Sequence, residues 1–415
     1  MQGRTVTALV SRDGRYVGST RPFEVPGPWW GYVEAITRHL DELLGVPTAV
    51  VRLLSADRAY INTGGPVTYH VEALAPPRHG VLDGGVLDGR EPECWPGALV
   101  DHPLRARWAR PGGPHELLTW AEKAAGRPLA GRSTQVKTWN LSCVYRLSTV
   151  DGPLWAKANA HFSGDEAECF RQVHRRDPSL APAVLAADRA GRRFLAGHAP
   201  GTDCWDAGLD TVRDVVQRWV AVQAAIAADP PVADPPAAGI REFPPSVLLA
   251  ELPRLLGGQA GAELDAGELA AARALVHRLP ELLADLGSSG LPHTLVHGDL
   301  HPGNLRSDGT NHMIIDWAEG YLGHPAADIE KLAYWLPAEQ RDAARACWID
   351  AWQAQLPGCD PKRALEPMSV LFHLMDAVVY QRFLDGIEPT ERLYHEGDPA
   401  GEVRVALRAA ASLRG

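Results

Sequence analysis

The chain has 415 residues, with 41 basic and 51 acidic side chains, a formal net charge of -10 and a pI near 5.9. Because this charge gives no excess positive field, the composition argues against a nucleic-acid or anionic-membrane partner and leaves room for a cationic ligand. The 6 cysteines form no C-x-x-C pair, and no apolar run reaches membrane-spanning length. We therefore expect a cytoplasmic protein of about two or three domains. A monomer is compatible with this composition.

The first hundred residues predict a small α/β cap. Strands at 5–10 and 16–18 flank a polar turn and predict a hairpin. Apolar residues at helical spacing predict a helix over 30–44, and further strands are expected at 48–54 and 66–74. No catalytic set of side chains occurs here, so we interpret 1–100 as a cap on the main body. An independent binding module is the alternative.

A stretch rich in Pro, Gly and Arg, 76–115, follows the cap and reads as linker or surface chain. A short helix is expected at 116–125. We assign 101–130 to a linker with this short helix.

From residue 131 the pattern changes to three strands, and the third carries Lys157 between two alanines. A lysine inside an apolar strand needs a counter-charge for its ammonium. The next helix supplies one, because Glu166 shares a face with Phe170 and Val173, with Glu168 as runner-up. The alternative is an edge strand from which the lysine reaches solvent.

The turn between the first two of these strands lacks a G-x-G-x-x-G motif. Its Asn140 and Ser142 side chains, with nearby main-chain amides, are weaker candidates for binding the phosphates of a nucleotide. Two further strands at 182–185 and 193–195 and a turn at 196–201 complete a small lobe over 131–200.

The densest group of polar side chains lies in 295–316, LVHGDLHPGNLRSDGTNHMIID. Short apolar strands bracket it, so Asp299 and Asn304 lie on a tight loop and Asp316 ends the second strand. The His and Asp side chains could ligate zinc or iron. The spacing favours phosphoryl transfer, because an Asn five positions after an Asp, followed by a second Asp after a hairpin, is the kinase layout.

Residues 201–415 are predicted to be mainly helical, with a Pro-rich loop at 229–238. Helices are expected at 209–228, 245–256 and 264–286. After Asp316, a helix near Ala327 places Asp328 where it can cap that helix or fix the polar loop. Glu319 could face a metal, a substrate or solvent.

A nearly all-apolar stretch, 366–384, predicts a buried helix with one polar stripe. The stripe is either an internal hydrogen-bond network or the wall of a pocket for a polar ligand. The loop after it carries three carboxylates, which form a solvated acidic turn or pair with a substrate ammonium. The candidate substrate residues of stripe and loop are His373, Asp376, Tyr380, Gln381, Asp385, Glu388 and Glu391.

The order of these elements resembles the aminoglycoside phosphotransferase and choline kinase group of small-molecule kinases. The resemblance covers about 130–385 and is carried by the Lys157 strand, the Glu166 helix and the segments FLAGHAPG, HGDLHPGN and IIDW. It implies an α+β, two-lobed protein-kinase-like fold, with a small β-rich lobe over 131–200 and a helical lobe over 201–415. ATP and Mg²⁺ are the implied cofactors.

The resemblance also implies residue roles. Asp299 would be the catalytic base, Asn304 and Asp316 the magnesium ligands, and Lys157, paired with Glu166, the lysine on the α- and β-phosphates. In addition, Gly197 and Ala199 would hold adenine through their main chain, and His297 and His301 would position the loop by hydrogen bonds.

The N-terminal cap, which simple antibiotic kinases lack, is similar to that of bacterial sugar kinases of the maltokinase and glucosamine kinase type. We therefore expect transfer of the γ-phosphate to a hydroxyl of a sugar or amino sugar such as glucosamine. The alternatives are an aminoglycoside or choline-like amine as acceptor and a catalytically silent nucleotide-binding sensor.

Overall fold

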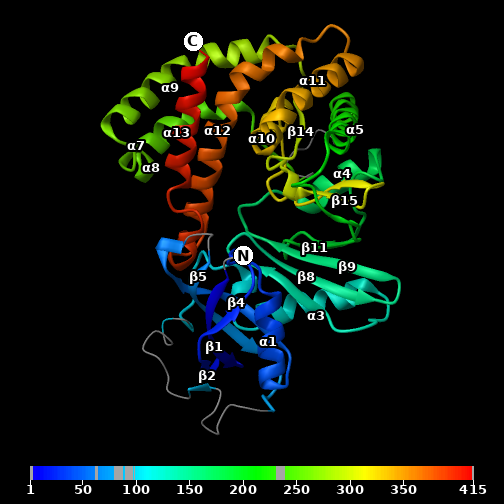
Figure 1. Ribbon diagram of the computed structural model, residues 1–415, viewed down its shortest axis with the longest axis vertical. Helices are drawn as coiled ribbons and strands as arrows, with labels where there is room; N and C mark the ends of the chain where they lie inside the picture. Colours follow the sequence, from blue (N-terminus) through cyan, green and yellow to red (C-terminus); the bar gives the residue numbers. More distant parts are fainter. Residues whose placement is uncertain are drawn as a thin grey trace. The chain divides into compact units, whose positions relative to one another are not determined.

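The structure, a computed structural model, describes residues 3–60, 64–78, 87–88, 97, 99–229 and 239–413 (Figure 1). Contacts divide the chain into two compact units, which are described separately. Unit 1 comprises Met1–Phe162, Leu185–His198 and Phe383–Glu396, and unit 2 comprises Ser163–Val184, Ala199–Arg382 and Gly397–Gly415. Much of the predicted linker 76–115 and the predicted loop after Asp229 lie outside the described residues.

A mixed sheet forms the first half of unit 1, and helix α1 (Glu34–Leu44) packs on it. Its strands are β1 (Arg4–Arg12), β2 (Arg15–Thr20), β3 (Phe23–Val25), β4 (Thr48–Ala56), β5 (Gly65–Ala73) and β6 (Leu87–Asp88), with the short helix η1 (Arg58–Tyr60) between β4 and β5. The order is β4-β5-β1-β2-β6, with β3 paired to β1. The predicted hairpin is confirmed, since β1 and β2 pair antiparallel. The first helix begins at Glu34, later than predicted.

A second sheet completes unit 1 and carries Lys157. It is preceded by η2 (Arg107–Ala109) and α3 (Gly113–Ala125), and its strands are β7 (Thr134–Thr138), β8 (Ser142–Thr149), β9 (Gly152–Asn159), β10 (Val184–Asp188) and β11 (Arg193–Ala196). The order β10-β11-β9-β8-β7 makes β9 the central strand. The edge-strand alternative for Lys157 is therefore wrong, because β8 and β11 pair with β9 on either side.

The two sheets of unit 1 are joined by specific contacts. The Gln135 side chain on β7 accepts a hydrogen bond from the Val50 amide and donates one to the Val50 carbonyl, both 2.8 Å long. Tyr394, from η5 (Pro389–Tyr394), lies in the hydrophobic core of the first sheet. The predicted cap and small lobe thus share unit 1. We retain the division into 1–100, 101–130, 131–200 and 201–415 as a proposal.

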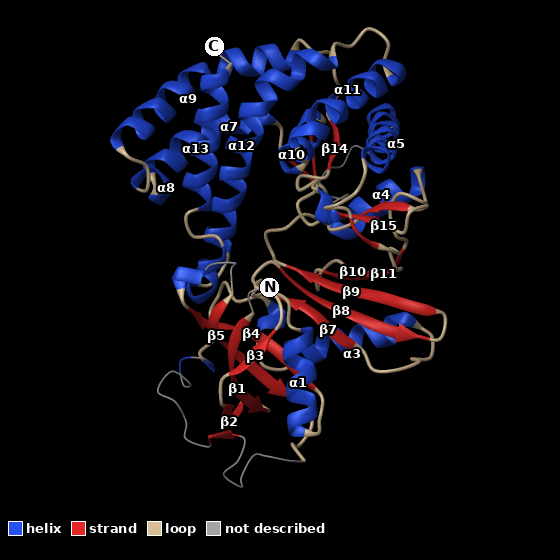
Figure 2. Cartoon of the chain, in the orientation of Figure 1, coloured by secondary structure: helices blue, strands red, loops and turns tan. Residues whose placement is uncertain are grey.

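Unit 2 is mainly helical, as Figure 2 shows. Its helices are α4 (Glu166–Arg176), α5 (Leu209–Ala228), η3 (Pro245–Val247), α7 (Leu248–Gly257), α8 (Gln259–Ala262), α9 (Ala266–Gly287), η4 (Pro302–Asn304), α10 (Ala326–Trp335), α11 (Ala338–Gln355), α12 (Pro361–Gly386, whose last turn belongs to unit 1) and α13 (Asp398–Ser412). The predicted helices at 209–228 and 264–286 are confirmed by α5 and α9. None of the described helices is both long and apolar enough to cross a membrane.

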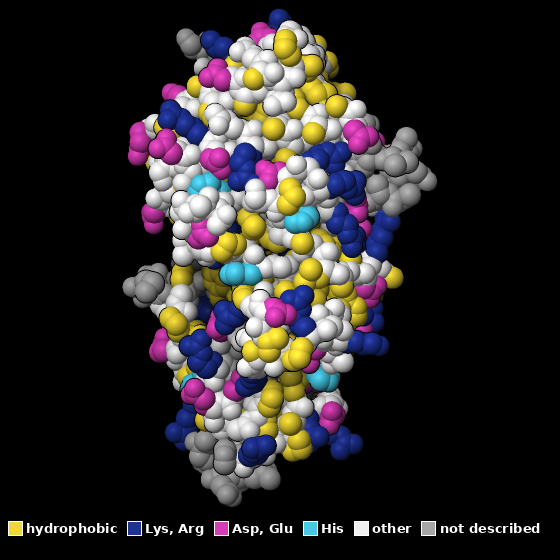
Figure 3. Space-filling model, turned by 90° about the vertical axis from the view of Figure 1, so that its right-hand side faces the viewer, with side chains coloured by type: hydrophobic (Ala, Val, Ile, Leu, Met, Phe, Trp, Pro, Cys, Tyr) yellow, Lys and Arg dark blue, Asp and Glu magenta, His cyan; other side chains and the backbone are white. Residues whose placement is uncertain are grey.

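Two three-stranded sheets in unit 2 hold its polar loop. One contains β12 (Thr202–Asp203), β15 (Leu305–Ser307) and β16 (His312–Ile314), and the other contains β13 (Arg241–Glu242), β17 (Tyr321–Gly323) and β14 (Thr294–Val296). The loop 297–304 therefore leaves one sheet and enters the other. On the face shown in Figure 3, acidic and basic side chains are interspersed over the described residues.

Candidate active site

The loop between β14 and β15 brings the predicted metal ligands toward each other. β15 and β16 pair antiparallel, with Leu305 opposite Ile314. The Ile315 amide then donates to the Asn304 carbonyl at 2.9 Å, so the chain reaches Asp316 directly beside Asn304. Asp316 has φ 64, a left-handed conformation that a non-glycine residue adopts at some cost. Such strain is common where a side chain must be aimed at a ligand.

Asp299 is held in the orientation that a general base needs. The Asn304 side-chain amide donates to the Asp299 carbonyl at 2.8 Å and to its Oδ2 at 3.1 Å. His301 Nε2 lies 3.4 Å from Oδ2, and Lys331 Nζ lies 3.6 Å from Oδ1. Burial raises the pKa of Asp299, but the His301 hydrogen bond and the Lys331 charge outweigh it and hold that pKa well below its usual range. The carboxylate is therefore ionised and can accept a hydrogen bond from a hydroxyl.

The two loop histidines form hydrogen bonds with main-chain groups of the loop and of the strand end beside it. His297 Nε2 donates to the Ile315 carbonyl at 2.9 Å, and its Nδ1 accepts from the Asp299 amide at 3.2 Å. Burial lowers the pKa of His297 to about 4, which keeps the ring neutral. His301 Nδ1 accepts from the Gly303 amide at 3.0 Å. With both of its nitrogens engaged, His297 has no lone pair for zinc or iron, which weakens the metal-site alternative.

Asp328, at the start of α10, fixes the loop as predicted. Its Oδ2 accepts from the His297 amide and from Trp219 Nε1, both at 2.9 Å, and its Oδ1 accepts from the Gly298 amide at 3.1 Å. Asp328 is 1% exposed, and this burial raises its pKa to about 6 despite the hydrogen bonds. The carboxylate ties the residues before Asp299 to α10 and α5.

Lys331 is the site residue that sequence reasoning missed. Its Nζ lies 2.6 Å from Asp376 Oδ2 and 3.6 Å from Asp299 Oδ1. Burial lowers the pKa of Lys331, but Asp376 and Asp299 together raise it well above its usual value. Lys331 follows Asp328 by one helical turn, so the i, i+3 relation to the loop-fixing residue was the available signal.

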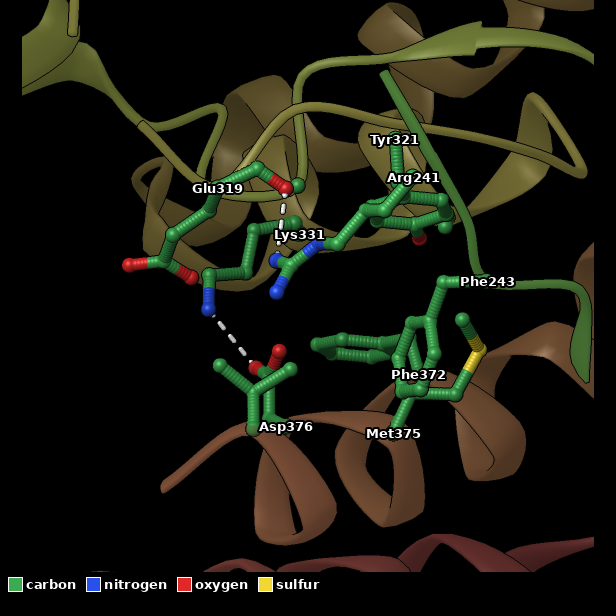
Figure 4. A pocket seen from close by; sticks show the side chains of 11 residues that line it. Arg241, Phe243, Glu319, Tyr321, Lys331, Phe372, Met375 and Asp376 are labelled. Atoms are coloured by element: carbon green, nitrogen blue, oxygen red, sulfur yellow. Dashed lines mark hydrogen bonds and ion pairs between the residues drawn. The ribbon is translucent and has the colours of Figure 1, made fainter. Parts of the chain in front are cut away.

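A small pocket lies beside Asp299 (Figure 4). The charged groups of Glu319, Lys331, Asp376 and Arg241 gather at one end, and Phe243, Phe372 and Met375 form an apolar end. All of these residues belong to unit 2. Asp376 thus lines a pocket and also pairs with Lys331 inside the protein. Both alternatives considered for the polar stripe on α12 therefore apply to this residue.

The other predicted substrate residues divide between the units. His373 Nδ1 lies 2.6 Å from Glu402 Oε2 of α13. Tyr380 and Gln381 lie on α12 within unit 2, whereas Asp385, Glu388 and Glu391 lie in unit 1. Their roles as substrate ligands stay predictions.

The expected solvated acidic turn is wrong for two of its three carboxylates. Glu388 and Glu391 are both 3% exposed. The Arg105 guanidinium donates to both oxygens of Glu388, and Arg52 Nη1 lies 3.6 Å from Glu388 Oε2. Only Asp385 is exposed as expected. Residues distant in sequence, Arg52 and Arg105, supply the charges that allow Glu388 to be buried.

The residues predicted to bind the nucleotide lie in both units, and each is described within its own unit. Lys157 is 8% exposed in unit 1, and Glu166 is 2% exposed in unit 2, where it accepts from the Trp317 amide at 3.0 Å. Glu168 instead accepts from Gln172 on its own helix. The pairing of Lys157 with Glu166 stays a prediction.

Asn140 and Ser142 have partners inside unit 1. Asn140 Nδ2 donates to the Glu391 carbonyl, and Ser142 Oγ accepts from Trp139 Nε1. Their contact with phosphates stays a prediction. Gly197 and Ala199 follow β11 without regular structure, and their main-chain groups make no hydrogen bond with another part of the chain that the structure describes. Their contact with adenine stays a prediction.

A sequence model described as the phosphotransferase enzyme family, APH, matches residues 130–365. The match spans more than half of the chain and contains Lys157, Glu166, Asp299, Asn304 and Asp316. The chain belongs to the APH phosphotransferase family. The predicted family is therefore confirmed, and with it a phosphotransferase activity of the small-molecule kinase type. A search of curated protein sequences found no match.

The chain is similar to three solved structures, the first of which supports the kinase-like fold expected for an APH protein. Choline kinase LicA from Streptococcus pneumoniae has a TM-score of 0.50 and 15% identity, covering 72% of this chain and 99% of that one. A choline/ethanolamine kinase family protein from Mesorhizobium loti has a TM-score of 0.49 and 16% identity, with coverage of 72% and 99%. Macrolide 2'-phosphotransferase MphH from Brachybacterium faecium has a TM-score of 0.47 and 20% identity, covering 69% of this chain and 97% of that one.

Proposed function

We propose that this APH protein uses ATP and Mg²⁺ to phosphorylate a hydroxyl of a sugar or amino sugar, such as glucosamine. The observation that carries the proposal is the geometry of Asp299. Asn304 and His301 hold its carboxylate, Lys331 keeps it ionised, and it adjoins a pocket with a charged end. A positioned, ionised carboxylate next to a pocket is what hydroxyl activation requires.

The donor set at Asn304 and Asp316 fits a magnesium ion. Both side chains offer oxygen ligands, which Mg²⁺ prefers. Because the Asn304 amide nitrogen is committed to Asp299, its Oδ1 is left as an acceptor for a cation. When bound, magnesium would neutralise charge on the phosphates.

The protein's own residues supply the remaining steps of the proposed mechanism. Asp299 Oδ1 orients the acceptor hydroxyl and takes its proton as the oxygen attacks the γ-phosphorus, while the bond from the γ-phosphorus to the ADP oxygen breaks and ADP leaves. The proposed role of Lys157 is to hold the α- and β-phosphates in position. Asp328 keeps the loop in place through the His297 and Gly298 amides. Positioning and charge stabilisation account for most of the rate in such transfers.

The N-terminal cap supports a sugar as acceptor, because the layout is similar to that of maltokinase and glucosamine kinase. An aminoglycoside or choline-like amine is the alternative acceptor. A silent nucleotide sensor is disfavoured, since every residue type expected for turnover is present at the loop. The cytoplasmic location stays a prediction.

The proposal is tested by ADP release from ATP and Mg²⁺ with glucosamine, glucose, maltose, choline and kanamycin as acceptors. We expect release to rise with one sugar and to fall by about 100-fold or more in Asp299→Ala, which removes the base. ATP binding should persist in that variant. Release with choline or kanamycin alone would contradict the sugar assignment.

A further inference from the structure

A pocket with a strongly basic lining, called here the basic pocket, lies within unit 1. Its volume is about 540 Å³, and it opens between η2, the first turn of α3, the end of β9 and the turn before β11. Glu116 is the one carboxylate among the described residues that line it. The arginines of the lining are Arg105, Arg107, Arg110, Arg192 and Arg193. Because the whole chain has a net charge of -10, this pocket reverses the overall charge locally.

The main chain holds η2 tightly against the start of α3. A Cβ added to Gly113, the first residue of α3, would clash with the Arg107 carbonyl oxygen and lie 2.8 Å from the Trp108 Cα, so a glycine is required there. The Gly113 amide donates to the Arg110 carbonyl at 2.9 Å. These contacts place two arginines beside the first turn of a 13-residue helix, whose N-terminal end adds a partial positive charge.

Glu116 brings two guanidinium groups of the basic pocket together. Arg107 Nη2 and Arg193 Nη1 donate to the same oxygen, Glu116 Oε1, at 2.6 and 3.3 Å. The Nε of Arg107 donates to Glu116 Oε2 at 3.1 Å, and the Nε of Arg193 donates to Asp188 at 3.0 Å. Among the described residues, Nη1 of Arg107 and Nη2 of Arg193 have no hydrogen-bond partner. Two neighbouring guanidinium groups therefore each keep a terminal nitrogen for a ligand.

Arg105 is a third such group, and it is buried. Its Nε and Nη2 donate to the Glu388 carboxylate at 2.8 to 3.1 Å, which leaves Nη1 without a partner in the part of the chain that the structure describes. The side chains of Arg105 and Arg193 are 4% and 13% exposed, so water screens their charges weakly. Because carboxylates already hold these side chains in place, a ligand would lose little affinity to ordering them.

The set of donors fits a phosphate group better than a carboxylate. A phosphate monoester carries about two negative charges near neutral pH and offers three terminal oxygens. A carboxylate has one charge and two oxygens. The planar guanidinium group is also the side chain best matched to phosphate oxygens. A volume of about 540 Å³ leaves room for an organic body beside the phosphate, within the usual range of small-molecule sites.

We propose that the basic pocket is a second ligand site, which binds a phosphate monoester of a small polar molecule. Arg107 and Arg193 bind neighbouring phosphate oxygens, Arg105 binds from the buried side, and Glu116 competes with the phosphate for the first two. The site goes beyond the proposed phosphoryl transfer. None of the residues proposed to hold ATP, Mg²⁺ or the acceptor lines this pocket.

Calorimetric titration of the full chain in phosphate-free buffer, without nucleotide, tests this inference. The three probes are glycerol 3-phosphate, glycerate and glycerol, which share a three-carbon body and differ in their anionic group. A salt concentration of about 0.15 M screens attraction to a merely basic surface. We expect glycerol 3-phosphate to bind at least about 10-fold more tightly than glycerate, and glycerol to show no binding.

Two variants of opposite charge change locate the binding. Arg107→Gln should weaken glycerol 3-phosphate binding by about 10-fold, whereas Glu116→Gln should strengthen it by about 3-fold, because the competing carboxylate is removed. The Arg107 side chain is 60% exposed, so its replacement should leave the fold intact, whereas loss of Arg105 would leave Glu388 buried without this partner. The matched control is Arg254→Gln on α7, an exposed arginine of unit 2, which should bind as wild type does.

The inference is overturned if glycerol 3-phosphate does not bind, or if it binds no more tightly than glycerate. It is also overturned if Arg107→Gln and Arg254→Gln have the same affinity, since the phosphate would then lie elsewhere, as at the nucleotide site proposed around Lys157. Opposite shifts in Arg107→Gln and Glu116→Gln, with an unchanged control, are the result that supports the site.

Discussion

Asp299, Lys331 and Asp376 form a chain of alternating charges at the proposed active site. The ammonium lies between two carboxylates, 2.6 Å from one and 3.6 Å from the other. Because the side chain of Lys331 is 9% exposed and that of Asp376 13% exposed, water screens these charges weakly. Lys331 therefore sets the position of the base and its ionised state together.

Replacing Lys331 by methionine tests its contributions to stability and to turnover. The variant leaves two partly buried carboxylates without their cation, and we expect a loss of about 1 to 3 kcal/mol in unfolding free energy. The turnover number should fall by about 100-fold, because the base loses its orientation. Denaturant unfolding and ADP release measure the two effects.

The double variant Lys331→Met, Asp376→Asn is the control for this prediction. Removing the second charge should restore part of the stability lost in the single variant. An unfolding free energy that is additive over the two substitutions would show that the pair is not coupled.

The candidate site residues that could be predicted are those that lie close together in the sequence. Asp299, Asn304 and Asp316 lie within one short stretch, and so their proximity followed from two turns. The contact of Lys331 with Asp376 and the arginines on Glu388 could not be found in this way, because tertiary packing joins segments far apart in the chain. Glu319 was considered as a residue that faces a metal, a substrate or solvent, and the structure places it in the lining of the pocket with Lys331 and Asp376.

Among the elements, η5 shows how a charged segment is buried. Glu391 on η5 is 3% exposed in unit 1, next to Glu388 and Arg52. Burial and the charge of Glu388 raise its pKa from 4.5 to about 8. A folded-state pKa above the unfolded value means that the native chain holds this proton more tightly. The stabilising contribution is complete below 4.5 and is lost as the pH rises toward 8.

The variant Glu391→Gln should remove this pH dependence. Relative to wild type, its unfolding free energy should rise by up to about 1.4 kcal/mol per pH unit as the pH increases from 4.5 to 8. Its Tm relative to wild type should rise over the same range. Thermal unfolding across this range measures the difference. Glu42→Gln on the exposed face of α1 is the control, and a constant Tm difference for Glu391→Gln would contradict the burial of an ionisable group.

Element types were predicted more accurately than their environments. The strand with Lys157 and the helix with Glu166, Phe170 and Val173 on its buried face appear as expected. Periodicity reports which face is apolar, but not which strand is central, so the order β10-β11-β9-β8-β7 needed the structure. The burial of Glu388 likewise depends on Arg105, which lies in the stretch interpreted as linker.

The whole molecule consists of two compact units, and the region that matches the APH family model runs through both of them. The region 130–365 contains the loop with Asp299, and helix α12, which begins within it at Pro361, supplies Asp376 to the pocket. The N-terminal sheet shares the first unit with the small lobe, through Gln135 and Tyr394. The proposed base, Asp299, and the pocket beside it lie in the second unit, whereas nucleotide binding is proposed to involve Lys157 of the first.

The central claim is that this chain transfers the γ-phosphate of ATP to a sugar hydroxyl with Asp299 as base. Mass spectrometry of glucosamine, after incubation with ATP, Mg²⁺ and either wild type or Asp299→Asn, tests it most directly. We expect a phosphorylated sugar with wild type and none with Asp299→Asn, while the variant still binds ATP. Equal phosphorylation by both proteins, or ATP consumption without any phosphorylated sugar, would contradict the account.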